Sequence, residues 1–223
     1  KAELEKALAL DPNDAGTQNG LGRVALEQQR YEDSERFFRK ASELAPEEPA
    51  YHYNFGLALK NLNRYEEAEK EYRAALSLKE SYLLARQGLG GLLYDQGLYD
   101  EAKAEFEKAL ALNSNDAGTY NGLGRVALEQ HRYEDAEEFF RRASELTPKE
   151  PAYHYNLGLT LKSLSSFEGA EKEFRRALEV DKEYYLAYNG LGGLFFEQKR
   201  YDQAKEEFKR SLSLNPKDAD AHN

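Results

Sequence analysis

Residues 19–25 read NGLGRVA, and the same seven letters return at residues 121–127. The two glycines resemble the loop that binds a dinucleotide phosphate. That loop needs a preceding strand and an acidic residue about 20 positions later. Here apolar residues at helical spacing, such as Leu21 and Ala25, run through the stretch. The sequence therefore favours a packing role for these glycines inside a helix.

The returning stretch belongs to a shorter period that runs along the chain. A Leu-Gly or Phe-Gly pair recurs every 34 residues, an aromatic residue follows ten positions after the Leu or Phe, and a second aromatic follows seven after that. The pairs are Leu21-Gly22, Phe55-Gly56, Leu89-Gly90, Leu123-Gly124, Leu157-Gly158 and Leu191-Gly192. Such a period predicts a repeat protein, in which each unit buries its apolar face only against its neighbours.

The pattern resembles the tetratricopeptide repeat family along essentially the whole chain. The resemblance implies an all-α fold, a right-handed superhelical solenoid of antiparallel helix hairpins in one domain. The implied segments are a half repeat at 1–14, repeats at 15–48, 49–82, 83–116, 117–150, 151–184 and 185–218, and the start of another helix at 219–223. The family's usual tryptophan is replaced by Gln18, His52, Arg86, Tyr120, His154 and Tyr188. We expect the two histidines to pack with one edge in water.

A longer period of 102 residues, or three repeats, lies over the shorter one. Residues 43–60 read ELAPEEPAYHYNFGLALK, and residues 145–162 read ELTPKEPAYHYNLGLTLK. Two interpretations stay open: a natural duplication, which the scattered differences favour, or an engineered array. The chain has no methionine and begins inside a helical pattern, which predicts a fragment or a processed chain.

Composition removes several classes of function. The net charge is -10, and an acidic chain repels phosphate backbones, so we expect no nucleic-acid partner. No apolar run approaches the roughly 18 residues of a membrane helix, so we expect a soluble protein of the cytoplasm or periplasm. Cysteine is absent, and the four histidines show no metal-ligand or triad spacing. We therefore predict no catalytic residue, metal or cofactor, and no enzyme activity.

The resemblance implies that the first helix of each repeat lines a concave groove. Family members that clamp extended peptides often place an asparagine just before the Leu-Gly pair, where this sequence has Asn54 and Asn156. An amide side chain can both donate to and accept from a peptide backbone. Asn19, Asn121 and Asn189 are shifted by one position and are secondary candidates. The alternative is that these asparagines are only solvated.

Other side chains are predicted to share this groove. The candidates are Arg23, Arg125, Lys60, Lys162, Tyr94, Phe196, Gly91 and Gly193. Six glycines that lie one or two positions from the glycine of a Leu-Gly pair are interpreted as bare patches where a partner approaches closely. They are Gly20, Gly88, Gly122 and Gly190 together with Gly91 and Gly193. Curvature of the superhelix is the alternative explanation for them.

The predicted function is a non-catalytic scaffold that binds a peptide or helix of a partner protein in the groove. The family's clamp for chaperone tails is not expected, because Leu84 and Gly88 stand where it needs basic residues. The alternatives are a structural array that associates end to end, an engineered array, or the substrate-recruiting arm of an enzyme such as a glycosyltransferase.

Overall fold

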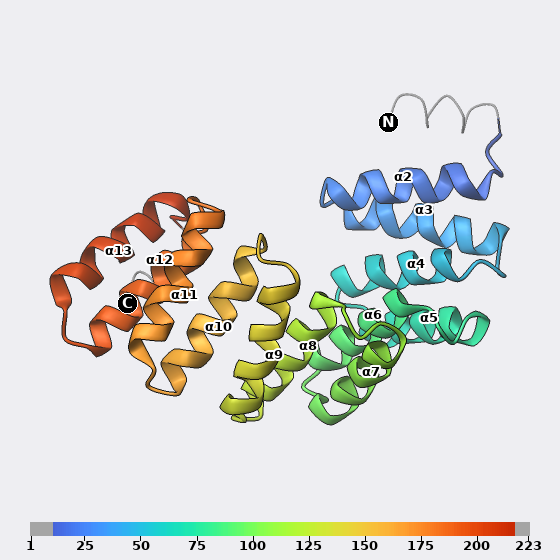
Figure 1. Ribbon diagram of the computed structural model, residues 1–223. Helices are drawn as coiled ribbons and strands as arrows, with labels where there is room; N and C mark the ends of the chain where they lie inside the picture. Colours follow the sequence, from blue (N-terminus) through green and yellow to red (C-terminus); the bar gives the residue numbers. More distant parts are fainter. Residues whose placement is uncertain (1–10, 217–223) are drawn as a thin grey trace. The chain divides into compact units, whose positions relative to one another are not determined.

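The computed structural model describes residues 11–216, which form twelve α-helices and no strand over this range (Figure 1). The helices are α2 (Ala15–Glu27), α3 (Tyr31–Leu44), α4 (Pro49–Asn61), α5 (Tyr65–Leu78), α6 (Leu83–Asp95), α7 (Tyr99–Leu112), α8 (Ala117–Glu129), α9 (Tyr133–Leu146), α10 (Pro151–Ser163), α11 (Phe167–Val180), α12 (Tyr185–Glu197) and α13 (Tyr201–Leu214). The predicted all-α fold is therefore confirmed. Most of the predicted half repeat, residues 1–10, and the segment 219–223 lie outside the described residues.

The chain divides into two compact units, residues 1–114 and 115–223, and each is considered by itself. In each unit, consecutive helices form antiparallel hairpins, such as α2 with α3 and α8 with α9 (Figure 1). The second helix of a hairpin also contacts the first helix of the next hairpin within its unit. We call the first helix of each hairpin its A helix and the second its B helix.

The A and B helices are spaced differently within each unit. Within each unit, each A helix contacts the next A helix, as α2 does α4 and α10 does α12, whereas the B helices described there do not contact one another. The A helices therefore lie on the more closely spaced, inner side of each unit. We call the surface made by α2, α4 and α6 in one unit, and by α8, α10 and α12 in the other, the A-helix face.

The turn inside each hairpin depends on one residue in the left-handed backbone region. These residues are Gln29, Asn63, Gly97, His131, Ser165 and Lys199, with φ between 57° and 76°. In the first hairpin the N–H of Gln29 donates to the carbonyl of Leu26, and the N–H of Arg30 donates to that of Ala25, both at 2.9 Å. This is the Schellman pattern that closes a helix C-terminus. The sequence did not reveal it, because only Gly97 is a glycine.

Short-range features of the sequence determine where the first helices of several hairpins start. Pro49 and Pro151 occupy the first turn of α4 and α10, where a missing N–H costs nothing. The Asp14 carboxylate accepts from the Thr17 N–H at 2.6 Å, and Asp116 accepts from the Thr119 N–H at 2.7 Å. Hydrogen bonds from the side chain and the N–H of Thr17 lower the pKa of Asp14.

The glycines of the Leu-Gly pairs allow the two helices of a hairpin to approach. A Cβ built on Gly22 would lie 2.6 Å from the Phe38 ring on α3, and one on Gly124 would lie 2.7 Å from Phe140 on α9. Carbon atoms normally approach no closer than about 3.5 Å. The same contact recurs at Gly56, Gly90, Gly158 and Gly192. The predicted packing role of these glycines is confirmed.

Two of the other glycines pack as well, which corrects the prediction that they are bare patches. A Cβ on Gly88 would lie 2.8 Å from the Tyr72 ring, and one on Gly190 would lie 2.7 Å from the Phe174 ring. Tyr72 and Phe174 are fully buried B-helix residues of the preceding hairpin. Gly88 and Gly190 therefore allow neighbouring hairpins to pack closely and leave no room for a partner.

Candidate functional site

Two pairs of asparagines join neighbouring A helices. The Asn54 Nδ2 group on α4 donates to Asn19 Oδ1 on α2 at 2.8 Å, and Asn156 on α10 donates to Asn121 on α8 at the same distance. All four side chains are half-buried. The two asparagines of each pair differ by one position within their repeats, as the sequence analysis noted. This offset lets the two side chains meet. Asn189 lies half-buried on α12.

Each predicted groove lysine lies in an ion pair beside an open glycine. The Lys60 ammonium is 2.9 Å from Asp95 Oδ2, and the Lys162 ammonium is 2.9 Å from Glu197 Oε1. A Cβ on Gly91 would have only the Lys60 ammonium within 4 Å, at 3.4 Å. Gly193 has the same relation to Lys162, at 3.7 Å. Gly91 on α6 and Gly193 on α12 thus leave space beside a lysine of the preceding A helix. That lysine is paired with a carboxylate on the same helix as the glycine.

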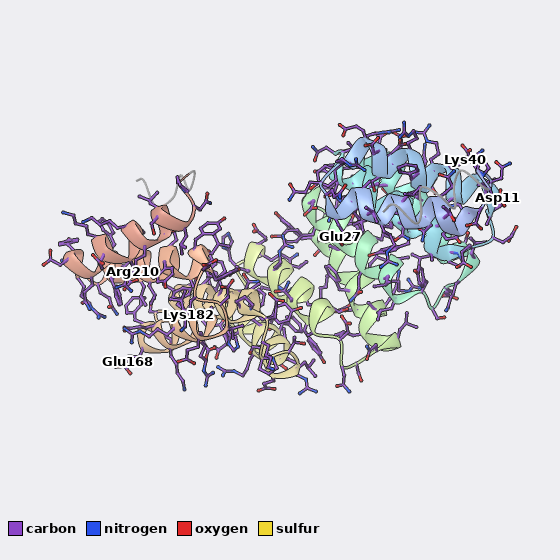
Figure 2. The ribbon with its side chains drawn as sticks, turned by 90° about the horizontal axis from the view of Figure 1, so that it is seen from above. Asp11, Glu27, Lys40, Glu168, Lys182 and Arg210 are labelled. Atoms are coloured by element: carbon purple, nitrogen blue, oxygen red, sulfur yellow. The ribbon has the colours of Figure 1, made fainter. Side chains whose placement is uncertain are left out.

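The remaining predicted residues lie on the A helices with different exposures. Arg23 and Arg125 are exposed on α2 and α8. Tyr94 is half-buried and contacts the Tyr99 ring, with centroids 5.7 Å apart. Phe196 is 59% exposed, so core packing does not account for it. Charged side chains also extend outward elsewhere, among them the Glu27 and Arg210 side chains labelled in Figure 2.

The position of the missing tryptophan has a shared role that the sequence did not reveal. At five of these positions the side chain donates a hydrogen bond to the backbone carbonyl of the residue six positions earlier. The contacts join Gln18 to Pro12 (2.9 Å), His52 to Pro46 (2.9 Å), Arg86 to Glu80 (3.2 Å), His154 to Pro148 (3.1 Å) and Tyr188 to Lys182 (3.2 Å). Different donor groups therefore hold the loop before five of the A helices: α2, α4, α6, α10 and α12. The residue types differ too much for a motif to show this.

His154 is more enclosed than predicted, since it is 7% exposed and both ring nitrogens have partners. Nδ1 lies 2.9 Å from Glu173 Oε2, and Nε2 lies 3.1 Å from the Pro148 carbonyl oxygen. Both partners only accept hydrogen bonds, so the doubly protonated ring satisfies both contacts. The hydrogen bond to Glu173 raises the pKa of His154. The expectation of a wet edge is wrong for this histidine.

The helices described here include none that is long and apolar enough to cross a membrane. In residues 11–216 no cluster of three or more His, Asp and Glu side chains could hold a metal ion.

Sequence models of known families match this pattern. Two models, both described as tetratricopeptide repeat, match the chain, one at residues 93–158 and the other at 1–49, 20–82, 53–117 and 155–219. The chain belongs to the tetratricopeptide repeat family. Proteins of this family are generally non-catalytic scaffolds for protein–protein interaction. None of the curated protein sequences matches the chain.

Solved structures have the same fold. The chain is similar to one in the Cut9–Hcn1 hetero-tetramer of APC/C, with a TM-score of 0.89, 20% identity, and coverage of 98% of this chain and 44% of the other. It thus spans less than half of that protein. For PilF of Pseudomonas aeruginosa the TM-score is 0.78 at 20% identity, covering 93% of this chain and 95% of PilF. YrrB is a tetratricopeptide repeat protein described with an unusual peptide-binding site. Its TM-score is 0.61 at 26% identity, and the match covers 83% of this chain and 95% of YrrB.

Proposed function

We propose that this protein is a non-catalytic interaction scaffold that binds a peptide or helix of a partner protein on the A-helix face. The observation that carries the proposal is the pair of matched asparagine bridges. After Asn54 donates to Asn19, the Asn54 Oδ1 atom and the Asn19 Nδ2 group have no further hydrogen-bond partner in residues 11–216. An acceptor and a donor then lie side by side, which matches the N–H and C=O groups of an extended peptide.

The surroundings of the asparagine pairs support the same function. Leu57 and Leu159 are half-buried and lie three residues after Asn54 and Asn156, so they flank the amides on the same helix face. Gly91 and Gly193 offer open backbone on the next A helix. A preformed surface that combines apolar area with a few placed polar groups is typical of binding sites. The peptide-binding site ascribed to YrrB agrees with this proposal.

The test begins with a peptide selected on the chain from a random 12-residue display library. Its Kd is then measured for the chain and for a variant with Asn54→Ala and Asn156→Ala. A peptide held on one unit loses one hydrogen bond of about 1 kcal/mol, which predicts a Kd roughly fivefold higher whichever unit it occupies. Arg73→Ala with Arg175→Ala is the matched control, because both arginines are exposed on B helices and each forms an ion pair with a glutamate four residues earlier on its own helix.

Two results would contradict the proposal. One is an unchanged Kd for the asparagine variant with a higher Kd for the arginine control, which would place binding on the B helices. The other is that no peptide is selected and that the sedimentation coefficient of the chain rises with protein concentration. That result would favour a structural array that associates end to end.

A further inference from the structure

Two of the hairpin turns carry an aromatic and acidic pattern that the asparagine pairs do not explain. Residues 94–100 read YDQGLYD, and residues 196–202 read FEQKRYD. Each has an aromatic residue followed by an acidic residue, and the same two classes again five positions later. The other four turns begin with leucine or lysine, as in LEQQRYE at 26–32 and KSLSSFE at 162–168.

The second of these turns presents its aromatic rings to solvent. Phe196, in the last turn of α12, is 59% exposed, and Tyr201, the first residue of α13, is 57% exposed. Their ring centroids are 5.6 Å apart and the rings meet edge to face. Large aromatic side chains usually bury their rings. A paired, exposed arrangement therefore offers an aromatic surface to a partner.

Carboxylates lie next to both rings. Glu197 follows Phe196 and keeps 47% of its side chain exposed while it contacts Lys162. Asp202 follows Tyr201 and is exposed. The same turn contains two cations, Lys199 and Arg200. Lys199 is exposed, whereas the Arg200 guanidinium lies 4.1 Å from the Phe195 ring centroid and donates to Glu171.

We propose that this aromatic–acidic corner, made of Phe196, Glu197, Tyr201 and Asp202, binds an arginine side chain in a basic segment of a partner protein. The inference rests on the proposed function and names the chemistry of the partner. A planar guanidinium stacks on aromatic faces and donates in a fork to carboxylates, which a lysine ammonium does less well. The net charge of -10 also favours a basic partner.

The neighbouring backbone leaves the corner open. Gly193 lies three residues before Phe196 on the same face of α12, and a Cβ there would have only the Lys162 ammonium within 4 Å. The first unit repeats the arrangement at Tyr94, Asp95, Tyr99 and Asp100, with ring centroids 5.7 Å apart. Tyr94 and Tyr99 are half-buried, so the corner on α12 and α13 is the more accessible of the two.

The probe is a fluorescein-labelled 12-residue peptide with three arginines separated by glycine and serine. Two matched peptides carry citrulline or lysine in place of arginine. Binding to the full chain is measured by fluorescence anisotropy, and contact with the Phe196 ring is followed by NMR of chain labelled with ¹³C-phenylalanine. We expect the arginine peptide to bind most tightly and to shift the Phe196 signals.

The variant is Phe196→Leu, because leucine occupies the equivalent position at Leu26 and Leu128 and the fold should persist. An exposed cation–π contact predicts an affinity for the arginine peptide about two- to fivefold lower, and no change for the citrulline peptide. Val180→Ala is the control, since Val180 is 38% exposed on α11 away from the corner. It should leave both affinities unchanged.

Three results would overturn the proposal: equal binding of the citrulline peptide, equal binding of the lysine peptide, or an unchanged affinity in Phe196→Leu. The variant with Asn54→Ala and Asn156→Ala shows whether only the arginine corner is wrong or the proposed scaffold function is wrong as well. A library-selected peptide that loses affinity in the asparagine variant, while the arginine peptide binds Phe196→Leu normally, would retain the scaffold and exclude the arginine corner.

Discussion

Two glycines three residues apart on α12 should respond to alanine with opposite signs. Alanine is favoured over glycine in a helix interior by about 1 kcal/mol. At Gly193 the added Cβ would have only the Lys162 ammonium within 4 Å, at 3.7 Å. The end of a lysine side chain moves easily. Gly193→Ala should therefore raise the free energy of unfolding by about 1 kcal/mol.

At Gly190 the same methyl group would lie 2.7 Å from Phe174, a fully buried ring. The Phe174 ring also contacts the backbone of Gly158, where a Cβ would again lie at 2.7 Å, so the ring has little room to move. Overpacking costs about 1 to 3 kcal/mol. A cost near the upper end exceeds the gain in helix propensity, so Gly190→Ala should lower the free energy of unfolding by about 1 to 2 kcal/mol.

The assay is urea unfolding followed by circular dichroism, with thermal unfolding as a second probe. For a chain of this length, 1 kcal/mol corresponds to a shift in Tm of about 2 to 4 °C. Gly193→Ala serves as the control for Gly190→Ala, since both changes add the same group to the same helix. The reasoning is refuted if both variants are stabilised, or if Gly193→Ala is destabilised as much as Gly190→Ala.

Three further changes test other parts of the structure. Gly97→Ala should lower the free energy of unfolding by about 1 kcal/mol in urea titration, because the φ of 76° at Gly97 strains any residue with a Cβ; no change would contradict the turn geometry. Asp116→Ala removes the cap of α8 and should cost about 1 kcal/mol, measured as a lower Tm. The hydrogen bond to Glu173 raises the pKa of His154 in the folded protein. The contact therefore stabilises the fold fully below about pH 6.5, the pKa of histidine in the unfolded chain, and this stabilisation is lost as the pH rises through the folded-state pKa. His154→Gln should remove that alkaline loss in unfolding curves recorded between about pH 6 and 8; the same loss in the variant would contradict the assignment.

The sequence predicted most of what determines each hairpin. The 34-residue period located the Leu-Gly pairs, and the contacts of Gly22 and Gly124 with buried rings follow from that register. The caps at Asp14 and Asp116 were also predictable, because capping depends on residues close together in the chain. The repeat boundaries and the 102-residue duplication stay predictions.

Contacts between repeats were less predictable. Gly88 and Gly91 lie three residues apart on the same helix, yet only Gly88 packs against Tyr72 of the preceding hairpin. A single sequence does not show how far one hairpin is turned relative to the next. For the same reason the bond between Asn54 and Asn19 became visible only in the structure.

The most direct test asks which face of the first unit, residues 1–114, a bound peptide covers. The chain has no cysteine, so Arg23→Cys places a single labelling site on the A-helix face, and Arg73→Cys places one on a B helix. Both arginines are exposed. The rate of maleimide labelling is measured with and without the library-selected peptide. We predict slower labelling at position 23 and an unchanged rate at position 73 when the peptide is bound. Protection at position 73 with none at position 23 would contradict binding on the A-helix face.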